Sequence, residues 1–69
     1  MKEMIVKVYN MLYSDEPERG VEIFLGNAIG LASIEGIGEW LNPLFDAAER
    51  QDYLFMADIL CHEILPKVA

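Results

Sequence analysis

Residues 23–34 constrain the fold most, because this stretch is almost wholly apolar. It reads Ile-Phe-Leu-Gly-Asn-Ala-Ile-Gly-Leu-Ala-Ser-Ile, and only Asn27 and Ser33 are polar. A helix that is hydrophobic on every side is usually buried on every side. Twelve residues are too few to span a bilayer, which takes about 20. We therefore expect a helix over residues 15–33 that is enclosed by other helices or by a partner.

The same stretch holds two glycines, Gly26 and Gly30, at a spacing that places them on one helical face. Each glycine lowers the stability of a helix by about 1 kcal/mol relative to alanine. Small residues at this spacing let a second helix approach closely. The pattern predicts that Gly26 and Gly30 lie in a close helix–helix contact.

Three further helices are predicted from spacing and capping residues. Residues 1–13 carry apolar side chains three and four apart, which is typical of an amphipathic helix. Ser14 can cap the helix that follows, with Pro17 in its first turn. Asn42 and Pro43 favour the start of a third helix that ends near Arg50. Residues 34–42 are open: they can be helix, kink or loop.

The last predicted helix is capped by Asp52 and ends near Leu65, where Pro66 stops it. Phe55 and Ile59 fall on the side of this helix opposite its main apolar face, with Met56 at the margin, which indicates a second contact surface. The main apolar face comprises Tyr53, Leu54, Ala57, Leu60, Cys61, Ile64 and Leu65.

Together these elements predict one domain over residues 1–69 with an all-α fold. The chain has no threonine and no convincing alternation of apolar and polar residues, so strands are not expected. Short connections make sequential helices antiparallel neighbours. We expect a compact bundle of three to four helices built from two antiparallel helical hairpins.

Charge and cysteine content restrict the cellular compartment and the classes of binding partner that we expect. Twelve Asp and Glu residues against five Lys and Arg give a net charge of −7, which disfavours nucleic acid and membrane surfaces as partners. Cys61 is the single cysteine, so no disulfide can form within the chain. With no signal peptide at the N-terminus, we expect a cytoplasmic protein.

The sequence offers little catalytic chemistry. Cys61 and His62 are adjacent on a helix and diverge by about 100°, so they do not form a nucleophile–base pair. Asp58 and His62 lie four apart and are weak metal-ligand candidates; one copy supplies two ligands where a stable site needs about four. We predict no catalytic residues, no enzyme activity and no cofactor.

A domain of this size has a small core, so a partner subunit is a natural source of added stability. We expect a protein–protein interaction module, most simply a homodimer, or otherwise a module that binds another protein. The predicted interface residues are Phe55, Ile59, Met56, Gly26 and Gly30. The alternative is a regulatory protein that binds a small ligand or a divalent metal through Asp58, His62 and nearby carboxylates.

The C-terminal segment, residues 52–66, resembles the C-terminal hairpin of a family of small uncharacterised helical proteins from Gram-positive bacteria. That pattern is roughly D-Y-x-x-x-A-D-L-L-x-x-E-L-L-P, and the matching residues here are Asp52, Tyr53, Ala57, Asp58, Glu63 and Pro66. Gly36, Gly38 and Asn42-Pro43 depart from the regular helices of the family. The resemblance implies an all-α fold in a bacterial cytoplasm and assigns no activity.

Overall fold

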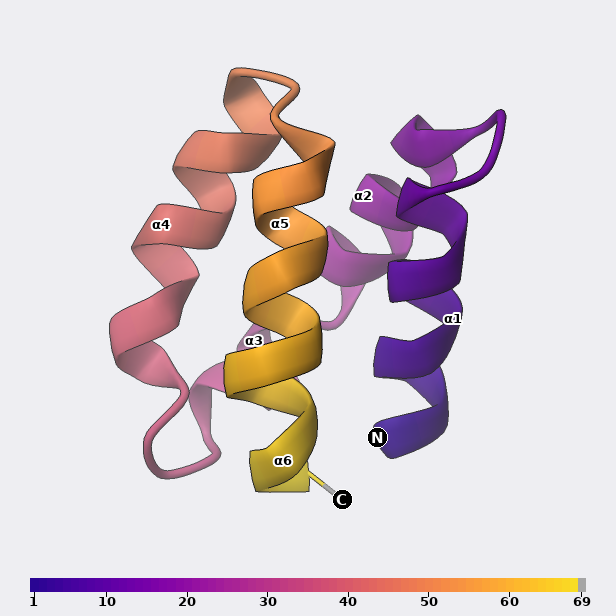
Figure 1. The fold of residues 1–69 in the computed structure, drawn as a ribbon. Helices are drawn as coiled ribbons and strands as arrows, with labels where there is room; N and C mark the ends of the chain where they lie inside the picture. Colours follow the sequence, from indigo (N-terminus) through magenta and orange to yellow (C-terminus); the bar gives the residue numbers. More distant parts are fainter. Residues whose placement is uncertain (69) are drawn as a thin grey trace.

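The computed structural model describes residues 1–68, and all regular structure in that range is helical. Helix α1 (Lys2–Leu12) turns back into α2 (Pro17–Gly26), which leads into the short α3 (Ala28–Ala32). Helix α4 (Gly38–Glu49) then pairs with α5 (Tyr53–Ile59). Figure 1 shows α1 with α2 and α4 with α5 as antiparallel neighbours, so the predicted all-α bundle of two helical hairpins is confirmed.

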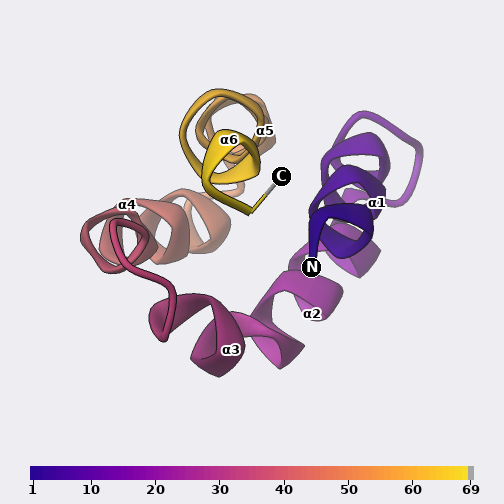
Figure 2. The same ribbon diagram turned by 90° about the horizontal axis from the view of Figure 1, so that it is seen from below.

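The described residues form more helical segments than the three or four expected. The predicted second helix is divided into α2 and α3, and α5 continues through a π-helical turn, η1 (Leu60–Ile64), into α6 (Leu65–Val68). In Figure 1 the segments α5, η1 and α6 form one continuous rod at the front of the molecule. Viewed along the bundle, the helices surround a common core, with α5 on the opposite side from α2 and α3 (Figure 2).

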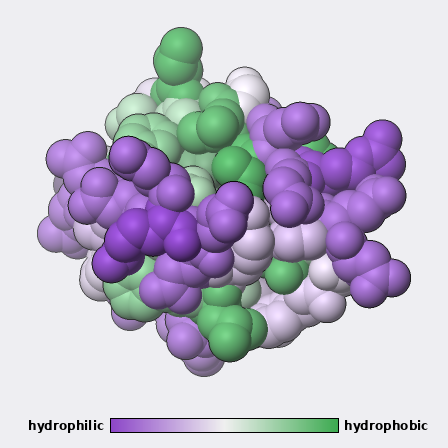
Figure 3. Space-filling view, turned by 90° about the horizontal axis from the view of Figure 1, so that it is seen from above, coloured by the Kyte–Doolittle hydropathy of each residue, from purple (hydrophilic) through white to green (hydrophobic). Residues whose placement is uncertain are grey.

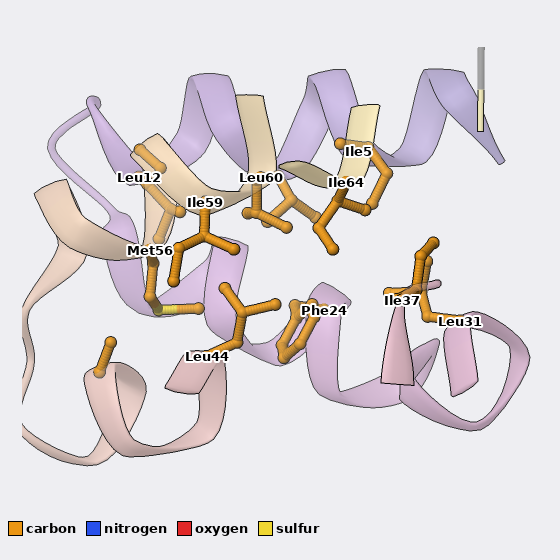
Figure 4. Packing of buried hydrophobic residues seen from close by; sticks show 13 residues of the cluster. Ile5, Leu12, Phe24, Leu31, Ile37, Leu44, Met56, Ile59, Leu60 and Ile64 are labelled. Carbon is orange, nitrogen blue, oxygen red and sulfur yellow. The ribbon is translucent and has the colours of Figure 1, made fainter. Parts of the chain in front are cut away.

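The core draws a side chain from nearly every helical segment and contains no polar side chain among the described residues. Figure 4 shows these side chains pointing toward one another from both hairpins. The buried residues are Ile5, Val8, Leu12, Phe24, Leu31, Ile37, Leu44, Ala47, Met56, Ala57, Ile59, Leu60 and Ile64.

The accessible surface shows that one copy of the chain closes this core by itself. The surface measures 4266 Å². A folded monomer of this mass is expected to expose about 4,400 Å². The accessible surface area is therefore that of a typical monomer of this mass. The apolar residues that do not fit in the core appear as individual exposed side chains.

Helix α1 follows the predicted apolar stripe. Ile5, Val8 and Leu12, three and four residues apart, are buried, while Met4 and Met11 are half-buried beside them. The polar side of the helix, including Glu3 and Lys7, faces solvent. Regular helical spacing of apolar residues was sufficient to place this helix on the core.

Helices α1 and α2 approach each other closely at Gly20, a residue that sequence reasoning missed. Gly20 is buried where α2 crosses α1. A Cβ atom at this position would lie 3.1 Å from Met11 Cβ and 3.1 Å from the carbonyl oxygen of Val8. Both atoms belong to or adjoin the α1 backbone, so they cannot move aside without moving the helix.

Replacing Gly20 with alanine is expected to destabilise the fold by up to about 2 kcal/mol. Overpacking a tight contact costs about 1–3 kcal/mol, and the gain of about 1 kcal/mol in helix propensity offsets only part of this cost. Gly26→Ala is the matched control. No atom outside the local helix lies within 4 Å of a Cβ built at Gly26, so this variant should gain up to about 1 kcal/mol.

Urea denaturation of the two variants at equal, low protein concentration measures the difference. The expected shifts of the transition midpoint have opposite signs. Equal stabilisation by both alanines would show that α1 and α2 do not meet closely at Gly20.

The turn between α4 and α5 is fixed by two hydrogen-bonding motifs that share one residue. The N–H of Asp52 donates to the carbonyl of Ala47 at 2.8 Å, and that of Gln51 donates to Ala48 at 3.1 Å, the pattern of a Schellman motif. Gln51 has φ 59° there. The Asp52 carboxylate then accepts from the N–H of Phe55 at 3.4 Å, so the predicted cap of the last helix is confirmed.

The predicted cap of the second helix is only partly right. Ser14 Oγ accepts a hydrogen bond from the N–H of Glu16 at 3.1 Å and donates to the Met11 carbonyl at 2.7 Å. The helix begins at Pro17 rather than at residue 15, and Glu16 occupies the cap position. Ser14 thus stabilises the turn between α1 and α2 rather than the first turn of α2.

The predicted helix start at Asn42-Pro43 is wrong, because α4 begins at Gly38 and Pro43 lies inside it. Residues 38–42, which the sequence left open, are helical. The N–H that proline lacks would have bonded to the carbonyl of Glu39, an exposed residue in the first turn. The missing bond thus lies near the helix end, while Ile37 and Leu44 are buried two turns apart.

The predicted stop at Pro66 is also wrong, because Pro66 lies within α6. In a regular α-helix its ring would clash with the carbonyl four residues back. The preceding turn, Leu60–Ile64, is π-helical and therefore wider. This wider turn provides room for the proline without ending the rod.

One side-chain hydrogen bond joins distant parts of the described chain. Lys67 Nζ donates to the Gly36 carbonyl at 2.7 Å, and Glu39 Oε1 lies 4.0 Å from the same nitrogen. Gly36 has φ 88°, a conformation that favours glycine. This hydrogen bond connects α6 to the turn between α3 and α4.

Candidate functional site

The most exposed large apolar side chain of the described residues, Ile29, lies on α3, and a further exposed one, Leu25, lies near the end of α2. Ile29 is 90% exposed and Leu25 is 51% exposed, and Gly26 and Gly30 are also exposed beside them. We refer to these four residues as the α2–α3 apolar surface. Figure 3, a view onto one end of the bundle, shows hydrophobic side chains in separate areas with hydrophilic ones between them, and one such area projects on the α2–α3 side.

The surface exists because the helix breaks at Asn27. The Asn27 side-chain amide donates to the Ile23 carbonyl at 2.8 Å, and Asn27 adopts φ −113°, ψ 5° between the two helices. Asparagine side chains compete in this way with the regular backbone bonds of a helix. Phe24 and Leu31, on either side of the break, turn inward and are fully buried.

Within one copy of the chain, residues 23–34 are therefore not buried on every side, and their enclosure by a partner stays a prediction. In this stretch, two large apolar residues, Phe24 and Leu31, reach the core. Leu25 and Ile29, four residues apart, point away from it. Sequence reasoning missed both residues, although their offset from Phe24 and Leu31 is the signal that could have separated the two sides.

Gly26 and Gly30 do not contact another helix of the described chain closely. No atom lies within 4 Å of a Cβ built at Gly26, and only Met1 Cε, at 3.6 Å, approaches one at Gly30. A packing reason for the two glycines within the chain is thus contradicted. Both remain available to a partner, which stays a prediction.

The predicted interface residues of α5 divide into an exposed and a buried group. Phe55 is 42% exposed, but Met56 is fully buried and Ile59 is 4% exposed. The assignment of Ile59 to a side facing away from the core is wrong. Helix α5 packs against both α1 and α4, so its second apolar side is covered by the chain itself.

The buried face of α5 is accordingly rotated from the predicted one, toward Met56 and Ile59. Leu54, expected in the core, is 65% exposed, and Cys61 is half-buried. Phe55 also belongs to α5, which lies on the opposite side of the bundle from α2 and α3, the helices that hold Gly26 and Gly30 (Figure 2). The five predicted interface residues thus do not form one surface.

The metal-ligand candidates Asp58 and His62 are both exposed. Between them the chain passes from α5 into the π-helical turn at Leu60, so they are not one regular α-helical turn apart. Among residues 1–68, His, Cys, Asp and Glu side chains form no group of three or more that could hold a metal ion. The described residues also enclose no pocket.

Among the described residues, the hydroxyl of Tyr9 on α1 is the one group whose pKa is clearly shifted. The pKa of its hydroxyl is raised above the ordinary value of 10.0, first by the negative charge of the neighbouring Cys61 thiolate and then by desolvation. The Tyr13 and Asp58 charges add to the rise. Tyr9 and Tyr13 also pack edge to face, with ring centroids 5.3 Å apart.

Stability is expected to fall above about pH 10 partly because of Tyr9. Its folded-state pKa is raised, so the native chain holds the phenol proton more tightly than the unfolded chain. This contribution is fully present below the unfolded pKa and is lost as pH rises through the folded one. Tyr9→Phe should therefore reduce the alkaline loss of stability, as measured by denaturation at pH 8 and pH 11.

An absorbance titration tests the cause of the raised pKa of Tyr9. Cys61→Ala removes the largest contribution and should lower the pKa of Tyr9 in an absorbance titration of the phenolates. The proposed cause would be contradicted if the titration of the Cys61→Ala variant matched that of the parent chain.

Among the described residues, no helix has both the length and the apolar character that crossing a membrane requires. The chain was also compared with known proteins. Neither protein-family models, nor curated proteins, nor solved structures gave a match. The resemblance of residues 52–66 to the Gram-positive helical family therefore stays a prediction.

Proposed function

We propose that this chain is a cytoplasmic protein–protein interaction module that associates with a second copy of itself through the α2–α3 apolar surface. The observation that carries the proposal is the exposure of Ile29, 90%, beside the exposed Leu25. Large apolar side chains grouped on a surface favour association, because pairing removes them from water.

The neighbouring glycines favour a helix as the element that packs on the α2–α3 apolar surface. Gly26 and Gly30 carry no side chain, and within the described chain almost nothing fills the space above them. A second helix can approach the backbone closely there, with Leu25 and Ile29 on either side of the contact. A second copy supplies such a helix, with the same apolar residues.

Size sets a condition on the proposed dimer. A stable interface buries about 800 Å² on each partner, which is roughly a fifth of the 4266 Å² that this chain exposes. The contact must therefore extend along both α2 and α3, beyond the side chains of Leu25 and Ile29. Exposed apolar Met1, whose Cε approaches Gly30, lies at the border of the surface and can extend it.

The test is molar mass by light scattering after size-exclusion chromatography, over a hundredfold range of concentration. We expect a dimer for the parent chain and a monomer for Ile29→Glu, because the new charge would have to be buried on association. Leu54→Glu is the matched control: Leu54 is exposed on α5, across the bundle, so this variant should remain a dimer.

Two results would contradict the proposal in different ways. A parent chain that stays monomeric up to high micromolar concentration would exclude self-association. A dimer that persists in Ile29→Glu would place the contact elsewhere, and Phe55→Glu would then test the exposed residue of α5.

A further inference from the structure

We infer that the net negative charge of the chain opposes its self-association, so that ionic strength controls the dimer; this rests on the proposed function. Each copy carries a net charge of −7, and the described part of the molecule measures 31 × 22 × 20 Å. Two docked copies thus place their charges within a few Debye lengths of each other, about 10 Å at 0.1 M salt and 30 Å at 0.01 M.

The absence of charge from the apolar surface favours a second copy as its partner. Residues 23–34 contain no Asp, Glu, Lys or Arg, although a quarter of the chain is charged. An equally acidic molecule can approach most closely at a charge-free face. A basic partner would instead gain most from the acidic faces, and salt would weaken its binding.

Glu22 brings the repulsion to the border of the surface. It lies one helical turn before Gly26, on the same side of α2, and is exposed. Among residues 1–68 the ion pairs join Arg19 to Glu16 and Lys67 to Glu39, so Glu22 has no cationic partner there. In a twofold dimer the same patch pairs with itself, and both copies bring a Glu22 carboxylate to the contact.

The repulsion is screened by added salt, whereas burial of Leu25 and Ile29 is not. The dissociation constant of the dimer should therefore fall by about tenfold or more between 10 mM and 150 mM NaCl. Sedimentation equilibrium at both salt concentrations measures this change on the intact chain.

Two isosteric variants separate the border charge from the total charge. Glu22→Gln and Asp58→Asn each reduce the net charge by one, but Asp58 lies on α5, on the opposite side of the bundle (Figure 2). Glu22→Gln should tighten the dimer at 10 mM NaCl and reduce its dependence on salt, by several times more than Asp58→Asn does.

The outcomes distinguish this inference from the proposed function. A dimer whose dissociation constant is unchanged by salt, or rises with it, overturns the electrostatic control and leaves self-association intact. Equal effects of the two variants overturn the assignment to Glu22. A chain that is monomeric at every salt concentration overturns self-association and, with it, this inference.

Discussion

Replacing Phe24 with alanine is expected to lower the free energy of unfolding by about 3–5 kcal/mol. Phe24 is fully buried at the centre of the core and packs against Phe45, with ring centroids 5.8 Å apart. A domain of this length has a total stability of only about 3–10 kcal/mol. The substitution should thus remove most of the cooperative transition seen by circular dichroism during urea denaturation.

Two further variants keep this prediction measurable. Phe24→Leu retains most of the volume and should cost about 1 kcal/mol, so its transition remains observable even if the alanine variant is unfolded. Phe55→Ala removes the same side chain from a position that is 42% exposed and should cost far less than Phe24→Ala. Equal losses at Phe24 and Phe55 would contradict the packing of Phe24 in the core.

Ile59→Glu is expected to unfold the protein, whereas Phe55→Glu, one turn earlier on α5, should leave it folded. Ile59 is 4% exposed, and its helix, α5, packs against both α1 and α4. A carboxylate there loses its hydration without gaining a partner, which costs several kcal/mol. At Phe55 the new carboxylate reaches solvent.

Helical circular dichroism and thermal unfolding at low protein concentration check this pair without reference to oligomeric state. The sequence pattern of α5 predicts the same exposed side for both residues. In the structure Ile59 is buried and Phe55 is exposed. A folded Ile59→Glu variant with unchanged thermal stability would mean that α5 is rotated relative to the arrangement described.

The contrast between these residues shows why helical spacing alone placed the interface incorrectly. A helical projection finds the widest apolar side, but it assumes that the helix has one packing partner. Helix α5 has two, α1 and α4, so residues on both sides of the projection are buried. Leu54, in contrast, lies in the first turn and is exposed although it belongs to the predicted apolar face.

The sequence by itself determined the features that depend on neighbours along the chain. The apolar stripe through Ile5, Val8 and Leu12 positioned α1, and Asp52 capped α5 through a bond to a residue three positions away. These local effects involve contacts within one or two helical turns, so they are visible in residue spacing. The all-α fold with two antiparallel hairpins followed from them.

Only the tertiary structure decided the features that depend on which surfaces meet. Asn27 divides an apolar segment and turns Leu25 and Ile29 outward, while Gly20, rather than Gly26 or Gly30, receives a neighbouring helix. Proline is tolerated inside α4, where the adjacent Leu44 is buried, and inside α6, where the preceding turn is π-helical and wider. Burial is a property of the assembled bundle, so residue spacing could indicate that apolar side chains need partners but not which partners they find.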